Sequence, residues 1–114
     1  MKIFKNSAAQ GDCLLLKIAK LPKGLSAVES EAGQFIIAHS ETGHNHCVKE
    51  RTTVKLYASV DQFRGYLDVK GDESVVLEHN RSFDTHEALE IQPGIYEIRR
   101  QRKYTPEGYR RAAD

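Results

Sequence analysis

The sequence predicts a single small all-β domain, of cupin-like, jelly-roll or barrel-like form, with about eight short strands. Short apolar or alternating segments recur at roughly ten-residue intervals, and residues that favour turns separate them. No segment carries the 3.6-residue period of a helix long enough to compete. The length of 114 residues fits one domain with a core of moderate size.

The expected strands are rich in β-branched, aromatic and leucine side chains. In chain order they cover residues 2–5, 13–19, 34–39, 44–48, 51–58, 65–69, 74–79, 86–91 and 95–102. Residues 6–12 are rich in turn formers, and residues 25–33 are ambiguous, with one helical turn as an option. The turn residues Lys70–Glu73 predict a hairpin that pairs 65–69 with 74–79.

Alternation assigns faces to two of these strands. Val54, Leu56 and Ala58 share one face of their strand. Leu89 and Ile91 share one face of a later strand. We expect these faces to meet in the core.

Charge is unevenly distributed along the chain. Residues 1–98 carry eleven basic and fourteen acidic side chains, whereas residues 99–114 carry six basic and two acidic ones. We therefore expect a β domain over 1–98, with 99–114 as its basic strand end and tail. The hydrophobic share of 39% and the charged share of 29% favour a folded protein over a disordered one.

Cysteine content and the N-terminus suggest a compartment. Two cysteines, Cys13 and Cys47, do not make a disulfide framework, although one bond between them is an alternative. Met1–Lys5 does not resemble a signal peptide, and the longest apolar run, Leu14–Leu16, is too short to span a membrane. We expect a cytoplasmic protein with reduced thiols and no membrane partner.

All five histidines lie between residues 39 and 86. His44 and His46 are two residues apart, so on an extended strand both imidazoles project from one face. His79 ends one expected strand and His86 begins the next. These four histidines predict a divalent-metal site, with His44, His46 and His86 as the first ligands and His79 next.

The metal-site hypothesis also includes a carboxylate and a choice of metal ions. Glu50 or Glu87 is expected as a fourth ligand or as a partner that orients a ring. Histidine ligands suit Zn, Fe, Mn or Ni, in a structural or a catalytic role. The alternative is that the histidines are exposed or hydrogen-bonded without metal. His39 and Cys47 are expected to be part of the scaffold, with Cys47 a buried small side chain.

Two resemblances concern the same histidines. His44-Asn45-His46 followed by Glu50 resembles the first half of the cupin metal motif, although Gly43 replaces the glycine expected further upstream. A broader likeness is to a group of small proteins of phages and mobile elements. It rests on Gln10-Gly11-Asp12, Thr42–His46, His86-Glu87, Pro93–Tyr96 and Gln101–Pro106. This resemblance implies that the Gly-His-x-His and His-Glu elements form one site, and it implies no reaction.

The basic tail interleaves cations with tyrosines, a pattern that can bind phosphate and stack on bases. Its residues are Arg99, Arg100, Arg102, Lys103, Tyr104, Tyr109, Arg110 and Arg111. Alternatively, these arginines offset the acidic body. A whole-chain pI of about 7.8 argues against a dedicated nucleic-acid binder.

Three functions therefore stay open: a metal site, a metal-free protein-interaction module, and nucleic-acid binding through the tail. The sequence contains no phosphate-binding loop, serine elbow or Cys-x-x-Cys pair, and whether the protein is an enzyme stays open. The exposed edges of a small β domain make a homodimer a reasonable expectation.

Overall fold

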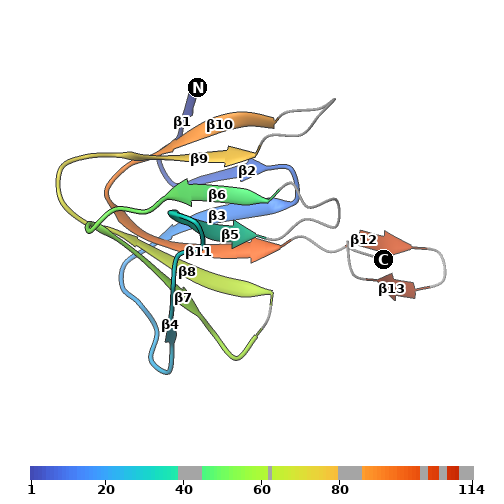
Figure 1. The fold of residues 1–114 in the computed structure, drawn as a ribbon. Helices are drawn as coiled ribbons and strands as arrows, with labels where there is room; N and C mark the ends of the chain where they lie inside the picture. Colours follow the sequence, from blue (N-terminus) through green and yellow to red (C-terminus); the bar gives the residue numbers. More distant parts are fainter. Residues whose placement is uncertain (39–44, 62, 80–85, 101–102, 106–107, 111–114) are drawn as a thin grey trace.

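Alternating apolar residues give this chain an all-β architecture, which confirms the predicted fold class. The computed structural model describes residues 1–38, 45–61, 63–79, 86–100, 103–105 and 108–110. For residue 86 and the residues after 100, the backbone alone is described. Two sheets pack face to face (Figure 1), and they do not close into a barrel.

The described residues form thirteen strands. The strands are β1 (Lys2–Ile3), β2 (Ser7–Gln10), β3 (Cys13–Ile18), β4 (Ser26–Val28), β5 (Gln34–Ala38), β6 (His46–Lys49), β7 (Val54–Ala58), β8 (Arg64–Val69), β9 (Val75–His79), β10 (His86–Ile91), β11 (Gly94–Arg100), β12 (Lys103–Thr105) and β13 (Gly108–Arg110). These residues include no helix, and hence none long and apolar enough to cross a membrane.

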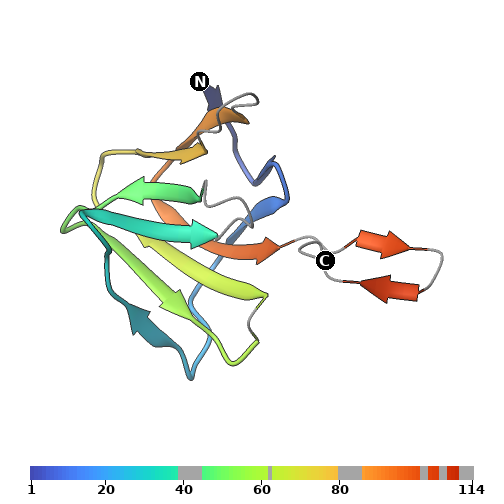
Figure 2. The ribbon, with the colours of Figure 1, turned by 45° about the vertical axis from the view of Figure 1, so that its right-hand side comes forward.

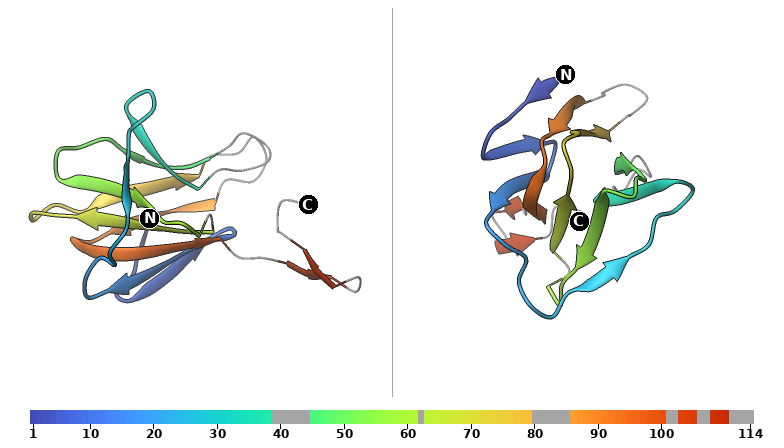
Figure 3. Two further views of the ribbon diagram at one scale, coloured as in Figure 1. Left: turned by 90° about the horizontal axis from the view of Figure 1, so that it is seen from below. Right: turned by 90° about the vertical axis from the view of Figure 1, so that its left-hand side faces the viewer.

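Strand order divides the chain into two layers. One sheet has the order β1-β10-β9-β6-β5 and the other the order β2-β3-β11-β8-β7-β4. Strands β1 and β4 lie at opposite extremes of the molecule (Figure 3). Strands β12 and β13 pair with each other outside the two sheets (Figure 2).

The turn at Lys70–Glu73 exists, but its role differs from the predicted hairpin. Gly71 has a φ of 85°, which glycine adopts without the strain of a side chain. However, β8 pairs with β7 and β11, while β9 pairs with β10 and β6. The turn therefore carries the chain from one sheet to the other. The turn residues predicted the turn itself but contained no information on which strands pair.

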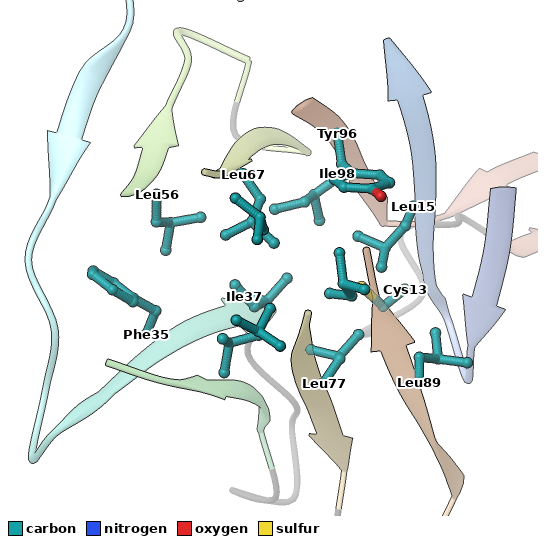
Figure 4. Packing of buried hydrophobic residues seen from close by; sticks show 14 of the residues in the cluster. Cys13, Leu15, Phe35, Ile37, Leu56, Leu67, Leu77, Leu89, Tyr96 and Ile98 are labelled. Carbon is teal, nitrogen blue, oxygen red and sulfur yellow. The ribbon is translucent and has the colours of Figure 1, made fainter. Parts of the chain in front are cut away.

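The core lies between the two sheets, where alternate side chains of each strand point inward. Leu15, Leu67 and Leu77 are fully buried. Figure 4 shows Leu67 of one sheet facing Ile37 and Leu77 of the other. Burial of each such side chain contributes about 1.5–3 kcal/mol before entropy costs. Leu89 and Ile91 point inward as expected.

Three expectations about local structure need correction. The turn-rich segment before Gly11 contains strand β2, whose Ala8 and Gln10 are buried. The ambiguous segment 25–33 contains strand β4, not a helical turn. Ala58 is exposed at the end of β7, unlike Val54 and Leu56. Pairing with β3 and with β7 decides the first two outcomes, and Ala58 is the last residue of its strand.

Several strands end or begin at the same end of the sandwich, on the right in Figure 1. Strands β6 and β9 are antiparallel with Cys47 opposite Glu78, so the first residue of β6 lies beside the last residue of β9. These residues are His46 and His79. The turn between β2 and β3 reaches this end as well. The fold thus collects polar side chains from distant parts of the chain.

A buried histidine pair at one end of the sandwich

Two histidines occupy inward-facing positions at this end. His46 is 1% exposed and His79 is 4% exposed. Their rings stack with centroids 3.8 Å apart and an interplanar angle of 24°. Each follows the alternation of its strand, because Val48 on β6 and Leu77 on β9 are also buried. Two strands therefore bring two imidazoles into contact inside the protein.

Gln10 holds this pair from the opposing sheet. Its side chain is buried at the end of β2, with 2% exposure. Its amide nitrogen donates hydrogen bonds to the main-chain oxygens of Leu77 and Glu87, each at 2.9 Å. Its amide oxygen lies 2.8 Å from Nδ1 of His46. The amide thus ties β2 to β9, β10 and β6 at once.

These contacts fix the tautomer of His46. Main-chain oxygens only accept hydrogen bonds, so the Gln10 atom between two of them must be the amide nitrogen. The atom beside His46 is therefore the amide oxygen, which also only accepts. Nδ1 of His46 must carry a hydrogen, and in the neutral ring the lone pair lies on Nε2.

Nε2 of His46 faces a carboxylate. Oδ1 of Asp12, in the turn after β2, lies 3.6 Å from Nε2. The other carboxylate oxygen lies 3.9 Å from Nη2 of Arg100, the last residue of β11. The Asp12 side chain is 43% exposed, so the site reaches solvent at this point. A ring nitrogen and a carboxylate oxygen therefore face each other here, at a distance longer than a hydrogen bond.

Both cysteines are free thiols. Burial, and after it the negative charge of neighbouring Asp12, raise the pKa of Cys13 to about 12, against a smaller lowering by Arg100. Cys47 alternates with His46 and Val48, so it faces away from the histidine pair. It is only half-buried, which differs from the buried position expected. Burial is also the first cause of the raised pKa of Cys47.

Of the four predicted histidine ligands, the structure describes three and brings two into contact. His46 and His79 are in contact, and His86 is the register partner of His79 on the adjacent strand β10. His44 and His39 lie outside the described residues. Among the side chains that are described, no group of three metal-ligating residues comes together.

Neither predicted carboxylate contacts the histidine pair. Glu50 is exposed and follows the far end of β6, four residues from His46, which is about 13 Å along an extended strand. The carboxylate of Glu87 points outward, 3.7 Å from the N-terminal amine. Glu87 contributes its main-chain oxygen to Gln10 instead. Asp12 is the carboxylate that reaches His46.

The structure places the residues of the basic tail in different surroundings. Arg99 forms an ion pair with Glu97 of its own strand, and Arg100 turns inward toward Asp12. Lys103, Tyr104 and Arg110 belong to β12 and β13 by their backbone. Arg102 and Arg111 lie outside the described residues. Nucleic-acid binding through these residues stays a prediction.

Sequence reasoning identified His46 and His79 but missed Gln10, Asp12 and the inward position of Arg100. The spacing of Ala8 and Gln10, two residues apart before a Gly-Asp turn, was the available indication of a strand. Nothing in the sequence indicated that this strand opposes residues 46 and 79.

The fold and this end of the sandwich define a small two-sheet β protein with a buried polar cluster. A family of domains of unknown function, DUF8820, matches residues 9–101, and the chain belongs to this family. That span includes Gln10, Asp12, both buried histidines and Arg100. Comparisons with curated proteins and with solved structures gave no match.

Proposed function

We propose that the protein binds a divalent metal ion at the histidine-pair end of the sandwich, through Nε2 of His46 and the carboxylate of Asp12. The observation that carries the proposal is the fixed tautomer of His46. Metal-ligating histidines donate their second ring N–H to a neighbouring acceptor, which orients the ring. Gln10 is such an acceptor at 2.8 Å.

The spacing of the two proposed ligands supports zinc best. Two ligands about 2.05 Å from a tetrahedral zinc ion are about 3.4 Å apart, whereas neighbouring ligands of an octahedral ion are about 3.0 Å apart. The separation of Nε2 and Oδ1 is 3.6 Å. The metals Fe, Mn and Ni, which also accept nitrogen and oxygen ligands, are the alternatives.

His79 is proposed as the next ligand because it lies beside His46; its ring stacks on that of His46, so it would have to turn for its in-plane lone pair to reach the same ion. His86 and His44 are proposed as further ligands on the basis of the sequence and of the register between His86 and His79. Four protein ligands would make a closed structural site, and three would leave a position for water or substrate.

Metal binding is tested on protein purified without a histidine tag and stripped with a chelator. We expect one equivalent of zinc by calorimetry and elemental analysis, with a rise in melting temperature on adding ZnCl₂. Asp12→Asn is the informative variant, because it preserves shape at a half-exposed side chain. It should weaken zinc binding about tenfold or more.

Glu50→Gln and Glu87→Gln serve as matched controls, since both remove an exposed carboxylate remote from Nε2 of His46. Both controls should bind zinc as the unmodified protein does. The proposal fails if the protein binds less than about a tenth of an equivalent of each of the four metals and none of them raises its melting temperature. It also fails if Asp12→Asn binds like the controls. A metal-free interaction module, the main alternative, would then take its place.

A further inference from the structure

A second feature, a cavity of about 220 Å³, lies beside the polar cluster. Its walls come from both sheets and are mostly apolar. They include Val28, Ile36, Leu56, Phe63 and Ile98. The wall reaches from buried side chains such as Leu56 and Ile98 to the exposed Ala58, so the cavity is open to solvent and a small molecule can enter it.

One charged side chain of the wall is incompletely paired. Arg100 lines the cavity, and its Nε is buried without a hydrogen-bond acceptor among the described residues. Its nearest carboxylate, Asp12, is 3.9 Å from Nη2, which is beyond hydrogen-bonding distance. A buried guanidinium N–H without an acceptor costs stability, so this position favours an incoming acceptor.

We propose that this cavity binds a small monocarboxylate with an apolar body, whose carboxylate pairs with Arg100 and whose body packs on Ile36, Leu56 and Ile98. Arginine presents several N–H donors in a fixed plane that matches a carboxylate. The apolar walls match a ring or a short alkyl chain.

Charge and size narrow the class of ligand. A phosphate dianion would need a second cation, but Arg64, the other arginine of the wall, is 3.6 Å from its own partner Asp61. Asp12 would add repulsion against a second negative charge. The volume exceeds the roughly 150 Å³ that admits benzene and is below the roughly 300 Å³ of drug-sized sites. A monocyclic or six-carbon acid is therefore the expected size.

Sodium benzoate and its neutral isostere benzamide are the probes, titrated into the full chain and followed by amide chemical shifts. We expect benzoate to bind with a Kd of about 1 mM or below, and benzamide at least about tenfold more weakly. Shifts should concentrate on β5, β7 and β11. This contrast uses the unmodified protein, so it does not depend on the folding of any variant.

Variants locate the site. Arg100→Gln should weaken benzoate binding about tenfold, and Ala58→Leu, at the wall, should weaken it by filling space. Arg99→Gln is the matched control, since Arg99 is next to Arg100 in the sequence but pairs with Glu97. This variant should bind benzoate as the unmodified protein does. Equal binding of benzoate and benzamide, normal binding by Arg100→Gln, or no benzoate shift at about 10 mM would each overturn the proposal. None of these results depends on metal, so failure here is distinct from failure of the zinc site.

Discussion

Replacement of Gln10 by methionine tests whether one amide holds the two sheets together at the histidine pair. Methionine preserves the length of the side chain and removes its polar atoms. Three groups then lose a partner: the main-chain oxygens of Leu77 and of the partly buried Glu87, and Nδ1–H of His46. Each loss costs about 1–3 kcal/mol, and we take the lower value because a main-chain oxygen has a second lone pair.

The sum is a destabilisation of about 3 kcal/mol, equivalent to roughly 10–15 °C in melting temperature for a domain of this size. Urea unfolding followed by circular dichroism measures it, with an unchanged m-value. Gln34→Met on the edge strand β5 is the control, since Gln34 is exposed, and it should change stability by less than about 0.5 kcal/mol. A cost below about 1 kcal/mol for Gln10→Met would refute the reasoning.

Four further predictions concern protonation and hydrogen bonding. In ¹⁵N-edited NMR at neutral pH, His46 should be the Nδ1–H tautomer, because Gln10 accepts from that nitrogen; the Nε2–H form would contradict this. At pH 8 iodoacetamide should label Cys47 and spare Cys13, whose pKa is raised to about 12 by burial, while both react in urea. Tyr96→Phe should cost about 1 kcal/mol through the lost 2.7 Å bond to the Gln92 main-chain oxygen. Burial also raises the pKa of Tyr96, as it does for Cys13, so the folded state retains protons that the unfolded state releases. Stability should therefore fall as pH rises above about 9, and constant stability up to pH 11 would contradict this.

Periodicity predicted most of the strands but not their partners. Each strand's alternation is a local property, whereas pairing depends on which apolar faces meet after the chain has turned. Gly71 marks a turn in sequence and in structure, yet the two strands that it joins belong to different sheets. The segment before Gly11 looked like a turn because its residues are small and polar. Pairing with β3 makes it a strand.

The site was half predictable for the same reason. The sequence singled out His46 and His79 by residue type, whereas their inward position came from the structure. Glu50 was selected by its spacing from His46 in sequence, but an extended strand carries it to the far end of β6. Asp12 precedes His46 by 34 positions in the sequence, and only the packing of one sheet on the other determines such a contact.

A buried polar cluster can serve structure alone, and a double variant separates that role from metal binding. If the cluster is only structural, adding His46→Leu to Gln10→Met should recover about 1 kcal/mol, because the unsatisfied Nδ1–H is removed with the ring. The zinc proposal predicts the same partial recovery in stripped protein, together with loss of the thermal shift by ZnCl₂. The two roles therefore differ only in how ZnCl₂ changes the melting temperature. If the melting temperature of the double variant still rises with ZnCl₂ as in the unmodified protein, His46 is not a ligand.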